Sequence, residues 1–219
     1  MLRAVAFATA LRGEAALLSD DLELAESELH DAADLHRELG SPAGEAHSLQ
    51  RLAEVQLGRG DREAATRLLH RALPLARWST IGDHLMHRVY GSMIEAAPDL
   101  AAARAVVDRA EATLGVDDRC TFCSIMLAVP AARACADVGD LEDARRHLQV
   151  AETSEALWEG TAWQASVLEA RAHLARAERH DSEAGRLLAE AAALLDAAGH
   201  GRDAARCRAG STHAAGRAD

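Results

Sequence analysis

Small and branched aliphatic residues recur along the chain in one pattern: an alanine, an aliphatic residue four positions later, and a second alanine three positions after that. The five copies are Ala25/Leu29/Ala32, Ala65/Leu69/Ala72, Ala103/Val107/Ala110, Ala144/Leu148/Ala151 and Ala184/Leu188/Ala191. Subtracting the number of each first alanine from the next gives steps of 40, 38, 41 and 40. Spacings of three and four place side chains on one face of a helix, so the pattern predicts a tandem helical repeat.

A turn signal precedes each copy of the pattern. The signals are Asp20-Asp21, Gly60-Asp61, Pro98-Asp99, Gly139-Asp140 and Asp181-Ser182. Glycine can close one helix, and aspartate or serine can accept the free amide hydrogens that open the next. Another small residue lies about twelve positions upstream of each first alanine, at Gly13, Ala53, Gly91, Ala132 and Ala172. Small residues on both helices allow close approach, so each repeat is predicted to be a helical hairpin.

The expected fold is therefore all-α. We predict five hairpins at about 2–39, 42–78, 80–115, 118–157 and 161–198, and a short closing helix near 201–209. Residues 1–209 are expected to form one repeat domain. Residues 210–219 lack apolar periodicity and are expected to be a flexible tail. The abundance of alanine, leucine, arginine and glutamate agrees, because all four favour helices.

The best copies, from Gly60 to Ala72 and from Gly139 to Ala151, resemble the tetratricopeptide repeat family. The period of about forty exceeds the roughly thirty-four residues usual in that family. With the stretches Arg119–Cys123, Leu157–Trp163 and Asp203–Cys207, the chain resembles the sensor arrays of large bacterial LuxR-type and maltose-regulator-type transcription regulators. The resemblance implies a right-handed superhelical solenoid. It also implies a non-catalytic protein- or peptide-binding scaffold, serving as the sensor or partner-docking module of a bacterial transcriptional regulatory system.

In arrays of this family the first helix of every hairpin lines a concave groove. Projecting that pattern onto the chain gives the candidate groove residues Glu14, His47, Gln50, Glu54, Arg88, Ser92, Arg133, Glu169, His173 and Arg176. Arginines on such a wall could offer planar forks to the carboxylates of a partner. The alternative is that these residues are only the solvated faces of amphipathic helices.

A second functional hypothesis rests on Cys120 and Cys123. Two cysteines three positions apart at a helix start can share one side, and His84 and His87 have the same spacing in the preceding hairpin. Two thiolates and two imidazoles could bind one tetrahedral zinc ion. The cysteine pair alone could instead be redox-responsive. The structural alternative is that the cysteines are small core residues.

Charge and composition exclude several function classes. The net charge of −11 repels phosphate, so direct nucleic-acid binding is not expected. All 24 basic residues are arginine, and the missing lysine excludes a phosphate-binding loop and Schiff-base chemistry. No constellation of nucleophile, base and orienting acid stands out, so we predict no enzyme. Apolar stretches are too short to span a bilayer, and the protein is expected to be cytoplasmic, with homo-oligomerisation left open.

Overall fold

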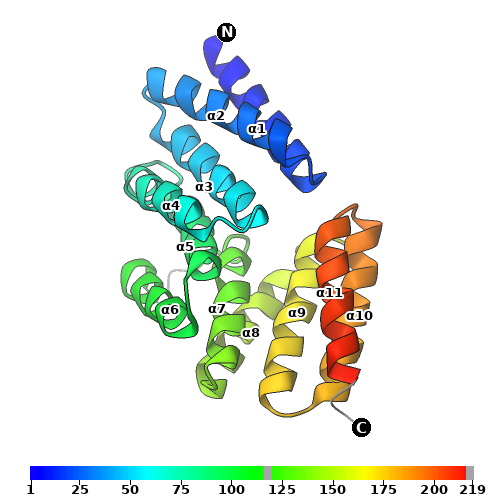
Figure 1. Ribbon diagram of the computed structural model, residues 1–219. Coiled ribbons are helices and arrows are strands. Elements are labelled where there is room, and N and C mark those ends of the chain that lie inside the picture. Colours follow the sequence, from blue (N-terminus) through cyan, green and yellow to red (C-terminus); the bar gives the residue numbers. More distant parts are fainter. Residues whose placement is uncertain (116–119, 216–219) are drawn as a thin grey trace. The chain divides into compact units, whose positions relative to one another are not determined.

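The computed structural model describes residues 1–115 and 120–215, with side chains up to residue 212, and every regular element in these ranges is a helix (Figure 1). The chain divides into two compact units, Met1–Asp118 and Arg119–Asp219. The all-helical prediction is confirmed for the described residues. The expected start of the fourth hairpin at 118 and the tail residues 216–219 lie outside them.

The first unit consists of three helical hairpins. They are α1 (Leu2–Leu18) with α2 (Leu22–Glu38), α3 (Pro42–Gly58) with α4 (Arg62–Arg77), and α5 (Gly82–Ala96) with α6 (Leu100–Leu114). The two helices of each hairpin pack together, and α2 packs on α3 as α4 does on α5. The first helices also contact one another, α1 with α3 and α3 with α5. Each hairpin therefore stacks on the next within this unit.

The second unit continues the same pairing. It contains α7 (Ile125–Asp137) with α8 (Leu141–Glu155), α9 (Ala162–Ala177) with α10 (Asp181–Ala197), and α11 (Gly201–Ala215). Helix α9 packs against α7, α8 and α10, and α11 packs against α10 (Figure 1). The helix pairs thus follow the order of the predicted hairpins, although the first helix of the fourth pair begins only at Ile125, after a turn at 121–124.

Aspartates in the predicted turns open four of the second helices. The side chains of Asp21, Asp61, Asp99 and Asp140 each accept a hydrogen bond from the backbone N–H three residues later, at 3.1, 2.8, 2.8 and 3.2 Å. Gly60 and Gly139, each just before its aspartate, have φ of +82°, a left-handed conformation that favours glycine. In these four turns the capping is as the sequence predicts, whereas α10 begins at Asp181 itself, after His180, whose side chain makes no capping hydrogen bond.

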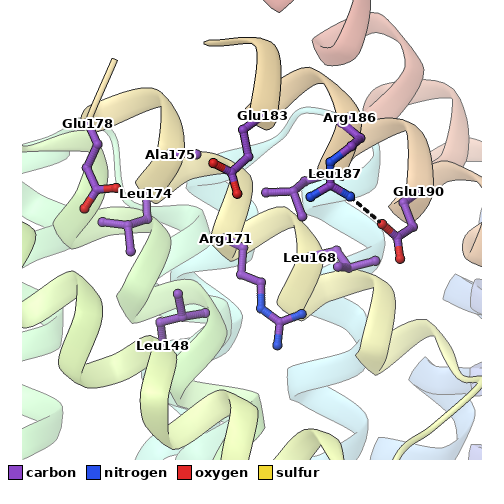
Figure 2. A pocket seen from close by; sticks show the side chains of 10 residues that line it. All are labelled: Leu148, Leu168, Arg171, Leu174, Ala175, Glu178, Glu183, Arg186, Leu187 and Glu190. Atoms are coloured by element: carbon purple, nitrogen blue, oxygen red, sulfur yellow. Dashed lines mark hydrogen bonds and ion pairs between the residues drawn. The ribbon is translucent and has the colours of Figure 1, made fainter. Parts of the chain in front are cut away.

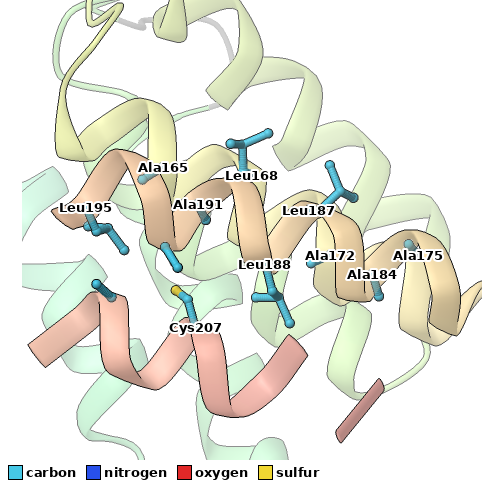
Figure 3. Close-up of a cluster of buried hydrophobic side chains, with 12 residues drawn as sticks. Ala165, Leu168, Ala172, Ala175, Ala184, Leu187, Leu188, Ala191, Leu195 and Cys207 are labelled. Carbon is cyan, nitrogen blue, oxygen red and sulfur yellow. The ribbon is translucent and has the colours of Figure 1, made fainter. Parts of the chain in front are cut away.

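The repeated small residues form the cores of the hairpins. All ten alanines of the five copies are buried, and Leu29, Leu69 and Val107 have no exposed surface. Gly13 shows why a small residue is needed, because a Cβ at that position would lie 2.6 Å from the Leu29 Cγ atom. In the second unit, the repeated residues of α10 pack with α9 and α11 in one cluster (Figure 3).

The last helix is longer than predicted. It runs to Ala215 instead of ending near 209, so part of the expected tail is helical. The Ser211 hydroxyl donates to the Gly185 carbonyl oxygen of α10 at 2.9 Å. A Cβ at Gly210 would lie 3.1 Å from Leu188 Cδ1. Close packing on α10 accounts for a helix whose own sequence has no apolar stripe.

Across the described ranges, none of the helices has both the length and the apolar character that crossing a bilayer requires.

Candidate functional site

The six groove candidates of the first unit come together on the first helices of its three hairpins. They are Glu14 on α1, His47, Gln50 and Glu54 on α3, and Arg88 and Ser92 on α5. We call this set, together with Arg51, the first-helix wall. Contacts between its members link α1 to α3 and α3 to α5, so the wall is one polar network.

Direct hydrogen bonds hold the network together. Gln50 Nε2 donates to Glu54 Oε1 at 2.6 Å and to Ser92 Oγ at 2.8 Å. Arg88 Nη1 lies 3.1 Å from His47 Nε2, and Arg88 Nη2 lies 3.9 Å from Glu14 Oε1. Glutamine and serine are both nearly fully buried. The wall is a packed polar layer, unlike the freely solvated face that was the alternative.

Arg51 is the member that the sequence analysis missed. It pairs with Glu14 on α1, and its Nη1 donates to Glu54 Oε2 at 2.6 Å. The signal was present in the sequence, because Arg51 lies four positions after His47 and three before Glu54, on the same helix face. The side chain is buried to 9 % exposure, which makes it the most enclosed charge of the wall.

The charges of the wall largely satisfy one another. Two carboxylates, Glu14 and Glu54, face two guanidinium groups, Arg51 and Arg88. Burial opposes ionisation of Glu54, but the positive charges of Arg51 and Arg88, with hydrogen bonds from Arg51 and Gln50, outweigh it and lower the Glu54 pKa. A ligand carboxylate would therefore have to compete with Glu14 and Glu54 for the guanidinium groups of Arg51 and Arg88.

The His47 ring is uncharged at neutral pH. Burial, followed by the positive charge of Arg88, lowers the pKa of His47 to about 4. The unfolded chain, with a histidine pKa near 6.5, binds more protons between these two values, so stability falls as the pH falls. We expect His47 to account for a loss of about 2 kcal/mol in the free energy of unfolding between pH 7 and pH 5.

Urea titrations followed by far-UV circular dichroism at the two pH values measure this loss. The His47→Gln variant, which keeps a polar partner for Arg88, should show a pH dependence smaller by that amount. His70→Gln, at an exposed ring on α4, serves as the control and should behave like the wild type. An undiminished pH dependence in His47→Gln would contradict the assignment.

In the second unit the four remaining groove candidates lie on α7 and α9. Arg133 Nη1 is 3.8 Å from Glu169 Oε2, and His173 Nδ1 is 2.8 Å from Asp137 Oδ1. Arg176 lies near Gly210 of α11, since its Nη2 is 4.0 Å from where a Cβ at Gly210 would be. The structure thus brings Arg133 and Glu169 together and leaves His173 and Arg176 with other neighbours.

Glu169 is the centre of a second buried cluster. Its carboxylate is 3 % exposed, pairs with Arg206 at 2.8 Å and accepts a hydrogen bond from the Cys207 thiol at 2.6 Å. Burial raises the Glu169 pKa, but Arg206 and Arg133 outweigh this and lower it. Burial and the Glu169 hydrogen bond raise the pKa of Cys207 to about 12, so this thiol is unreactive at neutral pH.

The four predicted zinc ligands fall in different units, with the two histidines in the first and the two cysteines in the second. His84 and His87 are on α5, and His87 Nδ1 lies 2.6 Å from the Asp83 carbonyl oxygen. Cys120 and Cys123 precede α7, with their sulfur atoms 2.8 Å apart. In residues 1–115 and 120–215, no three His, Cys, Asp or Glu side chains are grouped closely enough to hold a metal ion. Both the zinc site and the redox pair stay predictions.

A hollow that the sequence did not indicate lies in the second unit, between α8, α9 and α10 (Figure 2). Its volume is about 440 Å³. Four leucines line it, namely Leu148, Leu168, Leu174 and Leu187. Charged side chains surround these leucines, namely Arg171, Glu178, Glu183, Arg186 and Glu190. We call this feature the α8–α10 hollow.

Ion pairs already occupy most charges at the hollow. Arg171 binds Glu152 at 2.8 Å and Glu155 at 2.9 Å. Glu178 pairs with Arg145 at 2.5 Å, and Arg186 with Glu190 at 3.3 Å. Glu183 is exposed and makes no ion pair with any described residue. Among the lining residues, three carboxylates face two guanidinium groups, which leaves a surplus of one negative charge.

Comparison of the sequence with known proteins does not identify a family. No family model and no curated protein matches the chain.

Proposed function

We propose that this chain is a non-catalytic scaffold that binds a short amphipathic segment of a partner protein in the α8–α10 hollow. The observation that carries the proposal is the combination of four leucines with a surplus of carboxylates around them. Aliphatic side chains of the segment would pack on Leu174, which is partly exposed, and on the edges of the three buried leucines, and its basic groups would lie toward the carboxylates. The site includes side chains of the first helix α9 but none of the groove candidates, which are where the family resemblance alone would put it.

The charge balance favours a basic segment over an acidic one. Arg171 and Arg186 already pair with glutamates of the same chain, so an incoming carboxylate would have to displace one of these glutamates. Glu183 has no such partner among the described residues, and a guanidinium or ammonium group can pair with it directly. Electrostatic complementarity of this kind chiefly sets specificity and the rate of association.

Support for the scaffold role also comes from the first-helix wall. Its arginines are bound to glutamates of the same chain, so the wall stabilises the stacking of hairpins and leaves few groups available for a ligand. We further propose that the hairpins continue one right-handed superhelix and that the chain serves a bacterial transcriptional regulatory system through protein contact. The supporting observations are the repeated hairpins and the resemblance of the sequence to such sensor arrays.

Selection from a displayed library of random 16-residue peptides tests the proposal. We expect the enriched peptides to carry aliphatic residues at helical spacing and an excess of arginine and lysine. Binding of a labelled selected peptide, followed by fluorescence anisotropy, should be at least tenfold weaker to Glu183→Arg, which is about 1.4 kcal/mol.

The matched control is Glu23→Arg, which makes the same charge change in the first turn of α2 at an exposed position of the other unit. It should leave the affinity within twofold of the wild type. Enrichment of acidic peptides, failure to enrich any peptide, or equal binding to Glu183→Arg would each overturn the assignment of the hollow.

A further inference from the structure

The turn that precedes α7 holds two cysteine sulfurs close together. Cys120 and Cys123 are both thiols, and the Cys123 thiol donates to the Cys120 sulfur at 2.8 Å. The backbone N–H groups of Cys123 and Ser124 both donate to the Cys120 carbonyl oxygen, at 2.8 and 2.9 Å. The backbone therefore closes the turn and keeps the two side chains together.

The backbone of this turn suits a disulfide bond. A turn closed between a residue and the third residue after it brings the two Cα atoms within about 7 Å of each other. Disulfides join cysteines whose Cα atoms are about 4.4–6.8 Å apart, through a sulfur–sulfur bond of about 2.05 Å. Bond formation between Cys120 and Cys123 therefore requires their sulfur atoms to approach by less than about 1 Å.

The cysteines differ in their access to solvent. Cys120 is exposed, whereas Cys123 is 5 % exposed, so a reactant in solution reaches the Cys120 sulfur first. Cys135 has no exposed surface and Cys207 is 1 % exposed. Burial and the hydrogen bond to Glu169 also raise the pKa of Cys207 to about 12. Reaction with a small molecule should therefore begin at Cys120.

The two residues between the cysteines are anchored on α8 and on the segment that follows it. The Ser154 hydroxyl of α8 donates to the Thr121 carbonyl oxygen. The centroid of the Phe122 ring lies 4.4 Å from that of Trp158. These contacts hold the turn in the conformation that brings the sulfurs together. Two groups held close in this way react with each other far faster than with groups in solution.

We propose that Cys120 and Cys123 form a reversible dithiol–disulfide site that exchanges with low-molecular-weight disulfides. Cys120, after releasing its proton to water, attacks one sulfur of such a molecule, whose sulfur–sulfur bond breaks, and the other half leaves as a thiolate. Cys123 then releases its proton and attacks the Cys120 sulfur, and the second half leaves as a thiolate. The two thiolates take up the two protons. One disulfide is thus reduced to two thiols, and two protein thiols are oxidised to one disulfide.

Incubation of the reduced full chain with oxidised glutathione tests the site. Trypsin cuts after arginine, so a digest of the alkylated and unfolded product contains the peptide 120–133, which includes Cys120 and Cys123 but neither Cys135 nor Cys207. We expect mass spectrometry to find this peptide two hydrogens lighter than its dithiol form, and Cys135 and Cys207 alkylated. A peptide that remains a dithiol, or a disulfide that includes Cys135 or Cys207, would overturn the proposal.

Two variants separate the steps of the exchange. In Cys123→Ser the second thiol is missing, so glutathione should stay attached to Cys120 and accumulate to at least about ten times its level on the wild type. Cys120→Ser should react at least about tenfold more slowly than the wild type, because the thiol left in the turn is buried. Cys207→Ser is the control and should form the disulfide as the wild type does. Glutathione that stays on wild-type Cys120, or equal rates for Cys120→Ser and the wild type, would contradict the assigned roles.

Reversal of the reaction distinguishes an exchanging site from a permanent cross-link. An excess of reduced glutathione should return the peptide 120–133 to its dithiol form, since each step of the exchange can run backwards. A disulfide that resists this treatment would show that the site is not reversible. The two cysteines share no residue with the α8–α10 hollow, so this proposal and that of the peptide site can fail independently.

Discussion

Leu29→Ala is expected to lower the free energy of unfolding by about 2–5 kcal/mol, the largest effect we anticipate for a single substitution. Leu29 has no exposed surface and lies on α2 against Gly13 of α1. The leucine fills the space that the missing side chain of glycine leaves. Removing three carbons there opens a cavity, and Gly13 has no side chain that could fill it.

The same helix provides the control. Leu24 is 47 % exposed, so Leu24→Ala should cost no more than about 1 kcal/mol. Urea titration followed by far-UV circular dichroism compares the two variants, and the slopes must be checked because hairpins of a repeat protein can unfold separately. If Leu29→Ala lowers the free energy of unfolding no more than Leu24→Ala does, the hairpin core does not depend on the repeated aliphatic residue.

The hairpins could be predicted because their signals are local and repeated. Spacings of three and four define one face of a helix whatever it packs against, and Ala65 and Leu69 show the expected burial. Capping is equally local, since Asp61 accepts a hydrogen bond from the amide three residues later. Repetition of these signals strengthens the prediction, so most helix boundaries follow from the sequence. The exceptions are α10, whose start has no side-chain cap, and α11, which runs past residue 209.

The candidate sites depend on contacts between hairpins, which local patterns do not encode. Arg51 has the right spacing to join the wall, but its pairing with Glu14 requires α1 and α3 to lie side by side. The α8–α10 hollow depends likewise on the distance between α8 and α10 where both pack against α9. Helix α11 continues past residue 209 because of contacts with Gly185 and Leu188, twenty or more residues away.

The wall and the hollow differ in a way that bears on function. At the wall, largely enclosed carboxylates and guanidinium groups are balanced two against two, and the pKa of His47 near 4 keeps the ring uncharged. Breaking pairs that are shielded from water is costly, so the wall favours one stacking arrangement of α1, α3 and α5. At the hollow, several charges are exposed, and the charges are unbalanced around apolar side chains. We therefore expect binding of a partner to be more favourable at the hollow than at the wall.

Ala191→Leu is expected to destabilise the second unit by about 1–3 kcal/mol. Ala191 is the second alanine of the last repeated copy and has no exposed surface within the cluster that joins α9, α10 and α11 (Figure 3). A leucine adds three carbons where neighbouring side chains are already in contact. Alanine and leucine have similar helix propensity, so the loss would report packing rather than helix formation.

Ala193→Leu is the matched control, because Ala193 lies two residues further along α10 and is exposed. Its stability should stay within about 0.5 kcal/mol of the wild type. Urea titration by circular dichroism measures both variants. The four equivalent alanines, Ala32, Ala72, Ala110 and Ala151, are also fully buried. A destabilisation confined to position 191 therefore supports close helix approach as the property that the repeat maintains, whereas equal stability of both variants would refute it.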